Sequence, residues 1–565
     1  MNKLISSKLW WLYLLIIIIA INFIASQLHY RLDLTQEKRY TLSKPTKKLL
    51  SNLDEQVNID IFLKGDLKAG IKKLSKSTEE LLEEFKEYGN GKVHFRFFDP
   101  LISLDDSAKK DLVDSLKRMG IEPMNIVAQS KKGDEQSERF ILPGAVVKYK
   151  DRIFPVNLLK GISNTDENSL YNNAEALLEY KFANAIDKIT QTKVSAIGYA
   201  LGNGEPLDLR VYNLIEGLRK NYNFGIVKLD SLDFIPSQYN AIIIVKPTIK
   251  FADKEKLKLD QYVMHGGNII YMIDNLHAEM DSVRLDKENI VYDRGLNLED
   301  LFFKYGARVN QDLVLDMQCA TINFVIGMQG DKPQIQPLAW PYFPLLTGSL
   351  THPISKNLDP VFSKFTNSVD TVKSNGIKKT VLLQTSANGR IIGAPAIISF
   401  ESVKVANDPA IFNKPNIPVA VLLEGKFNSL YANRISSGMV DTLAKVYKQP
   451  YLPTAEKDGK IIICAGAEIV MNDVMQRGPA PMGYNKDINY TFANQDFIQN
   501  AFDYLVDASG ILETRSKDFT LRLLDPKKVE DNKSFWQFIN IVLPLILIIL
   551  FGFIYQFIRK RKYQG

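Results

Sequence analysis

Two long apolar runs lie near the ends of the chain. The first, Leu9–Leu28, reads LWWLYLLIIIIAINFIASQL, and Asn22 is its one strongly polar residue before Gln27. The second, Phe535–Ile558, reads FWQFINIVLPLILIILFGFIYQFI and carries no charged residue. A helix of about 20 apolar residues crosses the hydrocarbon core of a bilayer. We therefore predict a transmembrane helix at each end.

A cleaved signal peptide is the alternative interpretation of the first run. Its apolar region would span about 7–15 residues and end in a small-x-small cleavage site. The run Leu9–Leu28 is longer, and Ile24-Ala25-Ser26 matches such a site poorly. An uncleaved anchor is therefore favoured.

Between the two runs, the first part of the chain alternates strand and helix patterns. Val57–Gly65 has the period of a half-buried strand, and the apolar positions from Ile71 to Gly89 have helical spacing. The expected order is β-α-β-α-β-β-α, which is typical of a thioredoxin-like domain. The region contains no cysteine, which favours a binding or structural module over a redox enzyme. The further elements expected are a strand at Lys92–Pro100, helices at Asp105–Met119 and Asn172–Ile189, and a β-hairpin turning near Lys150-Asp151.

From Lys193 the pattern becomes a regular alternation of short apolar strands and amphipathic helices. Such alternation predicts a parallel sheet covered on both faces, as in flavodoxin-like domains. The strand pattern at Gly459–Asp473 and the helix pattern at Asn494–Asp507 complete this second domain. Residues 280–460 interrupt the alternation and predict a β-rich insertion, within which Pro333–Gly348 has a loop-like composition.

These patterns divide the chain into an α/β body and its membrane attachments. We expect an anchor and neck at 1–34, a thioredoxin-like domain at 35–190, and a flavodoxin-like domain with its insertion at 191–515. A linker at 516–534 and a second anchor with a basic tail at 535–565 follow. Residues 35–515 are called the body below.

Charge indicates the orientation of this body. Lys3 and Lys8 precede the first run, and Arg559, Lys560, Arg561 and Lys562 follow the second. Because basic residues favour the cytoplasmic side, both termini are expected in the cytoplasm and the body on the opposite side. These six cations account for most of the net charge of +7, so the body offers no basic excess that would predict nucleic-acid binding. The membrane lipid is the partner that the two runs imply.

The neck that leaves the first anchor carries charged and capping residues. Arg31 and Asp33 mark the exit from the membrane, and Tyr40 follows them in the sequence RLDLTQEKRYTLSKPTKKLL. Ser43 is expected to cap a helix that begins at Lys44, with Pro45 in its first turn. These residues are candidates for docking against a membrane partner.

A glycine-rich turn follows the first strand of the second domain. Gly202, Asn203, Gly204 and Glu205 lie at the predicted sheet edge, where phosphate groups bind in many α/β proteins. Their spacing matches neither the dinucleotide-binding pattern nor the P-loop pattern. A tight strand-to-helix turn is the favoured interpretation, and we expect no nucleotide or other cofactor.

The sequence contains no recognisable catalytic or metal-binding constellation. Cys319 and Cys464 are far apart, so they are either two buried thiols or one disulfide in an oxidising compartment. Cys464 ends a predicted strand, where a nucleophile could stand, but a thiol nucleophile needs a base and no histidine is paired with it in any recognised motif. A structural role is therefore favoured for Cys464.

Several segments carry a family resemblance: Arg31–Leu53, GNGEP at 202–206, VLLQTS at 381–386, PVAVLLEGKFNS at 418–429 and IIICAGAEIVMND at 461–473. On these the chain resembles the GldG family, the auxiliary "substrate-binding" components of gliding-motility-associated ABC transporters in Bacteroidetes. The resemblance implies a glutamine-amidotransferase-like second domain without a matching catalytic triad. It also implies a polytopic permease and a separate cytoplasmic ATP-binding subunit as partners, at a bacterial inner membrane with a periplasmic body.

The sequence thus favours a non-catalytic accessory subunit that couples an ABC permease and its ATPase to an envelope partner or cargo. An extracytoplasmic hydrolase or amidotransferase-like enzyme, or a ligand-binding receptor, are the alternatives.

Overall fold

The computed structural model describes residues 15–16, 18–19, 41–516 and 532–563, with gaps at 66, 102–104, 122, 130–135, 160–166, 192, 287, 331, 401–408 and 508. Residues 1–517 form one compact unit and residues 518–565 another, and each is considered by itself. Most of the predicted N-terminal span Leu9–Leu28 lies outside the described residues, as do Lys3, Lys8, Arg31, Asp33 and Tyr40.

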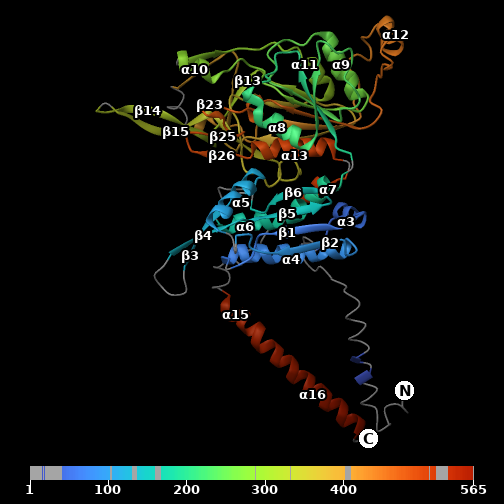
Figure 1. Ribbon diagram of the computed structural model, residues 1–565, viewed down its shortest axis with the longest axis vertical. Helices are drawn as coiled ribbons and strands as arrows, with labels where there is room; N and C mark the ends of the chain where they lie inside the picture. The colour runs from blue at the N-terminus through green and yellow to red at the C-terminus, as the bar shows by residue number, and fades with distance from the viewer. Residues whose placement is uncertain are drawn as a thin grey trace. The chain divides into compact units, whose positions relative to one another are not determined.

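The first sheet of the body has the strand order β2-β1-β5-β6 (Figure 1). Strands β1 (Val57–Ile61) and β2 (Val93–Phe97) are parallel and are joined by helix α4 (Ala69–Tyr88), which confirms the predicted β-α-β unit. Strands β5 (Gly144–Tyr149) and β6 (Arg152–Asn157) form the predicted antiparallel hairpin. Lys150 has a positive φ of 52° at its turn, as the hairpin turn requires.

Helices cover one face of this sheet because the strands alternate their side chains. Ile59, Ile61 and Val147 are buried in one cluster with residues of α3 (Lys44–Ser51), α4 and α7 (Leu178–Thr190). Asp60 and Lys148 lie on the opposite face, where the Lys148 Nζ is 2.8 Å from a carboxylate oxygen of Asp60.

Two features of this first part differ from the sequence prediction. The expected single helix at Asn172–Ile189 is broken at Leu177 into α6 (Glu167–Ala176) and α7. The strand that was expected to lead into the hairpin is also interrupted, at Pro143. Strand β4 (Gln136–Ile141) pairs with β3 (Met124–Gln129) in a separate ladder, because Pro143 cannot donate a ladder hydrogen bond and separates β4 from β5.

The second sheet has the order β14-β15-β18-β21-β22-β10-β9-β7-β8. Strands β7, β8, β9, β10 and β22 are parallel to one another, as the alternating pattern predicted. Strands β14, β15, β18 and β21 continue the same sheet in antiparallel fashion. Much of the region predicted as an insertion therefore extends the sheet. The bounds are β7 Ala196–Leu201, β8 Asn223–Lys228, β9 Ala241–Val245, β10 Asn268–Met272, β14 Cys319–Gln329, β15 Lys332–Gly348, β18 Ile377–Gln384, β21 Pro418–Gly425 and β22 Gly459–Cys464.

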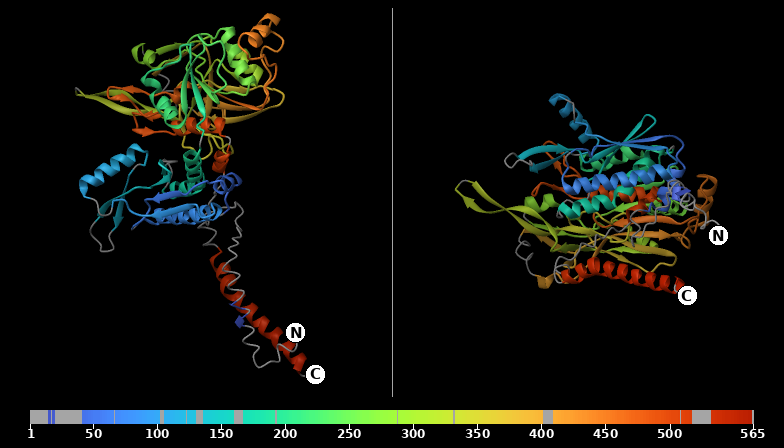
Figure 2. Two further views of the ribbon diagram at one scale, coloured as in Figure 1. Left: turned by 45° about the vertical axis from the view of Figure 1, so that its right-hand side comes forward. Right: turned by 90° about the horizontal axis from the view of Figure 1, so that it is seen from below.

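The loop predicted at Pro333–Gly348 is wrong, because these residues form strand β15. With β14 this strand makes a long hairpin, visible from three directions in Figures 1 and 2. Three of its prolines, Pro333, Pro337 and Pro341, recur every four residues, so these positions without an N–H fall on the same side of the strand, whereas Pro344 departs from the spacing. A strand tolerates such prolines where that side has no ladder partner. The spacing of these three prolines, rather than the number of prolines, was the informative signal.

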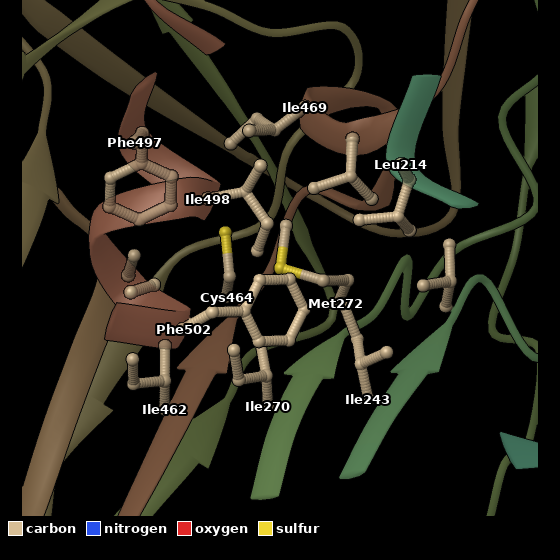
Figure 3. Packing of buried hydrophobic residues seen from close by; sticks show 14 of the residues in the cluster. Leu214, Ile243, Ile270, Met272, Ile462, Cys464, Ile469, Phe497, Ile498 and Phe502 are labelled. Carbon is tan, nitrogen blue, oxygen red and sulfur yellow. The ribbon is translucent and has the colours of Figure 1, made fainter. Parts of the chain in front are cut away.

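Apolar clusters cover both faces of the second sheet. Ile270, Ile462 and Cys464 pack on one face against helix α13 (Asn494–Val506), as Figure 3 shows around Phe497 and Phe502. Ile269, Ile461 and Ile463 pack on the other face, in a cluster that includes Leu259 and Val263 of helix α9 (Asp253–Met264). This burial on both faces confirms the expected architecture around the parallel strands.

The remaining elements connect or decorate the two sheets, and the last ones belong to the C-terminal unit. They are α5 Asp106–Arg118, η1 Leu209–Val211, α8 Tyr212–Asn221, α10 Met280–Asp286, β11 Glu288–Val291, α11 Glu299–Tyr305, β12 Ala307–Val309, β13 Asp312–Asp316, β16 Val361–Phe362, β17 Val369–Thr371, β19 Gly389–Gly393, β20 Ala396–Ser399, η3 Pro409–Ile411, α12 Ser437–Lys445, η4 Ala467–Val470, β23 Val474–Met475, β24 Gly478–Pro479, β25 Tyr484–Asn485, β26 Tyr490–Thr491, η5 Ile511–Ser516, α15 Lys533–Gln537, η6 Phe538–Val542 and α16 Leu543–Tyr563.

The C-terminal unit contains one helical stretch, Lys533–Arg561, that is long and apolar enough to cross a membrane. Its side chains are not buried against the rest of the protein. The predicted second span is therefore helical, and Arg559, Lys560, Arg561 and Lys562 lie in the last turns of α16. Within the described residues, this stretch fits a membrane-associated protein with a large body.

Candidate functional site

The carboxyl ends of the parallel strands bring polar residues to one edge of the second sheet. Ligands of open parallel sheets usually bind at this edge. Strand β9 ends at Val245 and is followed at once by Lys246. Asp274 lies two residues beyond β10, and Glu468 lies in η4 just beyond β22.

Lys246 is the centre of this edge. Its side chain is 7% exposed, and its Nζ lies 2.5 Å from Glu468 Oε1, 3.2 Å from Glu279 Oε2 and 3.6 Å from Asp274 Oδ2. Its backbone N–H donates to the Met272 carbonyl at 2.8 Å, and its φ of 45° is unusual for a residue with a side chain. The backbone thus turns sharply to place the ammonium among three carboxylates.

The charges of this cluster shift the pKa values of its members. Burial lowers the pKa of Lys246, but the carboxylates of Glu468, Asp274 and Glu279 outweigh burial and raise it above its ordinary value. Burial raises the pKa of Asp274 to about 6, although Lys246 opposes the shift. For Glu468, burial would raise the pKa, but Lys246 and Lys364 lower it below its usual range. Lys246 therefore stays an ammonium and cannot act as a free amine nucleophile.

Further ion pairs extend the cluster outward. Arg294 Nη2 lies 2.6 Å from Glu279 Oε1, and Lys364 Nζ lies 2.6 Å from Asp473 Oδ1. The Ala467 N–H donates to Asp274 Oδ1 at 2.7 Å, which fixes η4 to the end of β10. The cluster therefore joins the ends of three parallel strands, and its charged side chains are paired with one another.

The glycine turn lies beside this cluster and packs on the segment after β9. A Cβ on Gly204 would approach Thr248 Oγ1 to 2.1 Å, and its φ is +81°. The N–H groups of Thr248 and Ile249 both donate to the Asn203 carbonyl at 2.9 Å. These contacts confirm that the glycines serve a tight turn with a close approach of backbone. A binding role for the turn stays a prediction.

The two polar side chains of the turn point inward. Asn203 is 1% exposed, and its Nδ2 donates to Glu255 Oε2 at 3.0 Å. Glu205 is 8% exposed, and its Oε2 accepts from the Asn203 N–H at 2.8 Å. Burial raises the pKa of Glu205 to about 7, although backbone hydrogen bonds oppose the shift. Glu205 is thus a buried carboxyl that changes charge near neutral pH.

The cysteines do not form a reactive site. Cys464 is fully buried beneath Ile498 and Phe502 (Figure 3), and burial raises its pKa well above the ordinary value. Cys319 is also a free thiol, and burial raises its pKa to about 12. Burial and the raised pKa support the structural interpretation of Cys464, because a thiol nucleophile needs a thiolate and access. Among the described residues, no group of three or more His, Cys, Asp and Glu side chains could hold a metal ion.

The neck enters the body through α3, as predicted. Ser43 caps the helix by accepting from the Thr46 N–H, and Pro45 lies in the first turn. The Ser43 N–H donates to Glu179 Oε1 of α7 at 2.8 Å, which ties the neck to the first domain.

The sequence analysis missed the ion cluster. Lys246 directly follows a strand of five apolar residues, and Asp274 lies two residues beyond β10, whose last four residues are apolar. A charged residue directly after a fully buried strand marks the edge of a parallel sheet, and this was the available signal. Glu279, Arg294 and Lys364 lie in loops far apart in sequence, so only the fold brings them together.

A family model described as an ABC-type uncharacterized transport system matches residues 194–501, which is more than half of the chain. The chain belongs to this ABC transport auxiliary family. Membership supports an accessory role and associates the protein with an ABC transporter complex. The match spans the second sheet and the ion cluster. A domain of unknown function matches residues 36–148, which contain α3 to β5.

The similar proteins found do not add a known activity. A protein of Borreliella burgdorferi described as uncharacterized is 22% identical over 561 residues, with 94% of each chain covered. Among solved structures, the mmIFT52 N-terminal domain is 15% identical, with 55% of this chain and 98% of that chain covered and a TM-score of 0.30. An exo-β-1,4-mannosidase from Opitutaceae bacterium strain TAV5 is 12% identical, with 63% and 43% covered and a TM-score of 0.18.

Proposed function

We propose that this protein is a non-catalytic, membrane-anchored accessory subunit of an ABC transporter complex linked to gliding motility. Its body couples a polytopic permease and a separate ATP-binding subunit to an envelope partner or cargo. The body lies on the periplasmic side of a bacterial inner membrane, with both termini in the cytoplasm. Family membership supports the accessory role. The link to gliding motility rests on the resemblance of the neck and strand motifs to the GldG family.

The observation that carries the proposal is that the two ends of the body meet. The last helical turns, η5, pack against α3 and α7 of the first domain, although α3 and η5 are separated by most of the chain. Ile511 is 2% exposed within the core cluster of the first domain. A Cβ on Gly510 would lie 3.7 Å from Pro45 Cγ. The described chain therefore enters and leaves the body at neighbouring positions, which fits a body held at both ends by one membrane.

The paired charges and the buried thiol at the edge of the second sheet also support an accessory role. Lys246 is held by carboxylates, and Cys464 is buried beneath α13. No P-loop occurs in the sequence, so ATP hydrolysis must come from another chain. Two single anchors cannot enclose a pore, so another chain must also supply the transport path.

The fold assignments belong to the same proposal. The order β2-β1-β5-β6, with β5 antiparallel to both neighbours, supports a thioredoxin-like first domain. The parallel strands with helices on both faces support a flavodoxin-like or glutamine-amidotransferase-like second domain.

Purification from native membranes tests the proposal. The full chain is tagged in its own cells, extracted in mild detergent and analysed by mass spectrometry. We expect an ABC permease and an ATP-binding subunit in stoichiometric amounts. A matched chain with Arg31 and Asp33 exchanged for Asp and Arg tests whether the neck docks on the permease. Recovery of the tagged chain without either subunit would overturn the proposal.

An enzymatic role centred on Cys464 makes a different prediction. If the thiol were a nucleophile, Cys464→Ala would abolish function in vivo. Because Cys464 is a fully buried apolar contact, we expect Cys464→Ala to retain function.

A further inference from the structure

A cleft of about 590 Å³ opens beside the carboxyl end of β10, where its lining residue Asn275 directly follows Asp274 of the ion cluster. Its volume is within the range of small-molecule sites, about 300–1,000 Å³. Helix α11 supplies one wall, the segment from β12 to Gln311 a second, and the loop after β21 a third. Its lining residues are Asn275, Glu299, Asp300, Phe303, Lys304, Arg308, Val309, Asn310, Gln311, Leu430 and Arg434.

Asn275 gives this cleft an unsatisfied donor. Its residue is 4% exposed, its backbone N–H donates to Asn367 Oδ1 at 2.8 Å, and its carbonyl accepts from the Arg294 N–H at 2.9 Å. Its side-chain Nδ2 has no hydrogen-bond partner in the described part of the chain. An unpaired buried amide costs about 1–3 kcal/mol. A ligand oxygen that accepted from Nδ2 would remove this cost.

Two walls of the cleft are held by one buried carboxylate. Asp260 of α9 accepts from Tyr305 Oη at the end of α11 at 3.0 Å. It also accepts from the Leu430 N–H at 2.9 Å and from Ser429 Oγ at 2.5 Å. Asp260 is fully buried, so α11 and the loop after β21 are fixed relative to one another. The cleft is therefore formed before any ligand arrives, which lowers the entropic cost of binding.

The remaining charges of the cleft have both signs. Arg308 and Asn310 already contact Asp370, and Gln311 contacts Asp293. Asp300 is paired with the Lys256 Nζ at 3.0 Å, and Arg434 approaches it to 3.7 Å. By contrast, the side chains of Glu299 and Lys304 form no hydrogen bond or ion pair with other described residues. Glu299 as an anionic acceptor, Lys304 as a cationic donor and the Asn275 amide thus remain available, beside the apolar side chains of Phe303, Val309 and Leu430. Arg434 adds a second cation, which is held only by its 3.7 Å pair with Asp300.

We infer that this cleft binds a zwitterionic, peptide-like ligand, such as a short peptide with free termini. The ammonium end pairs with Glu299, and the carboxylate end pairs with Lys304 and Arg434. A backbone carbonyl accepts from Asn275 Nδ2, and small apolar side chains contact Phe303, Val309 and Leu430. The inference concerns the purified chain alone, so its outcome does not depend on the transporter role.

Calorimetric titration of the full chain in detergent micelles tests the inference. The probe is tri-alanine with free termini, and the comparison is tri-alanine acetylated and amidated at its ends. We expect the free peptide to bind and to raise the thermal unfolding midpoint, since a ligand of the folded state stabilises it. Blocking both termini should weaken binding at least about tenfold.

Variants assign the binding to the cleft. Asn275→Leu should abolish binding, whereas Asn289→Leu should leave it within about twofold. Asn289 is the matched control because its Oδ1 is also buried and unpaired but lies outside the cleft. If Asn275→Leu does not fold, Glu299→Gln, at an exposed position of α11, should weaken binding of the free peptide and not of the blocked one. Absence of binding at ~1 mM tri-alanine, or equal binding of both peptides, would overturn the inference.

Discussion

Lys246 shows how a single side chain organises the edge of the second sheet. It is 7% exposed and contacts three carboxylates that arrive from β10, η4 and the loop before α10. Removing one partner of a buried ion cluster leaves the others uncompensated in a medium of low dielectric. The residue therefore matters more through the charges it neutralises than through any reaction of its own.

Replacement of Lys246 by Met should destabilise the body by about 3–5 kcal/mol, because three carboxylates lose their common cation. Urea unfolding of the full chain in detergent, followed by the fluorescence of buried Trp340, measures the change. Lys378→Met is the matched control, since Lys378 is 71% exposed and forms a surface pair with Glu424 worth at most about 1 kcal/mol. Equal stability of the two variants would contradict the account of the cluster.

Glu205 makes the stability of the glycine turn depend on pH. Its pKa is about 7 in the folded protein and near 4.5 in an unfolded chain. Between these values the folded state holds a proton that the unfolded state has released, so stability falls as pH rises through this window. Relative to Glu205→Gln, the wild type should lose about 3 kcal/mol between pH 4.5 and pH 8. Unfolding midpoints that change in parallel for both proteins over this range would refute the assignment.

At the scale of elements, η5 connects the end of the second domain to the first. Asp507 accepts from the Ser509 and Gly510 N–H groups and so shapes the turn that leads into η5. The Arg515 guanidinium lies 5.4 Å above the Tyr180 ring of α7. Lys188 of α7 also pairs with Asp503 of α13 at 3.1 Å. The first domain is therefore held by the segment that leads toward the second anchor.

Loss of the Ile511 side chain should loosen this connection. Ile511→Ala should cost about 2–4 kcal/mol, because it leaves a cavity in the core of the first domain. Ile249→Ala is the control, since Ile249 is 57% exposed and should change stability by less than about 0.5 kcal/mol. Urea unfolding provides the free energies, and a cost below about 1 kcal/mol for Ile511→Ala would show that η5 does not hold the domains together.

Local patterns predicted most elements of the two sheets but not all of their connections. Strand β9 and helix α9 follow directly from a run of apolar residues and from helical spacing. Strand β15 was missed because proline content favoured a loop, whereas the four-residue spacing of Pro333, Pro337 and Pro341 fits a strand side without a ladder partner. The break at Leu177 was also missed, because apolar spacing continues through it.

The sites were less predictable than the elements. The cleft and the ion cluster depend on pairs such as Asp260 with Leu430 and Lys246 with Glu468, which are more than 150 residues apart. Sequence spacing carries no information on such contacts. By contrast, Ser43 was identified because a helix cap is a local feature.

At the scale of the whole molecule, the body is one compact unit whose entry helix and exit helix are in contact. A single apolar helical stretch, Lys533–Arg561, follows it in the described part of the chain. The family associates the protein with an ABC transporter complex. Together these observations support a membrane-associated protein with a large body that serves an ABC transporter complex.

The basic residues in the last turns of α16 should set the orientation of this tether. Replacing Arg559, Lys560, Arg561 and Lys562 with Glu removes the signal that retains the tail in the cytoplasm. We expect the variant to accumulate at a reduced level or with its tail translocated, as protease protection of the tail would show. An unchanged orientation would assign the topology to other features of the chain.

Labelling with a membrane-impermeant maleimide tests the central claim most directly. Single cysteines are introduced at Ser437, on exposed α12, and at Tyr563, near the end of α16, in a background of Cys319→Ser and Cys464→Ala. In intact spheroplasts the account predicts labelling of the Ser437→Cys chain and protection of the Tyr563→Cys chain until the membrane is lysed. Labelling of the tail together with protection of the body, or labelling of both positions in intact spheroplasts, would contradict it.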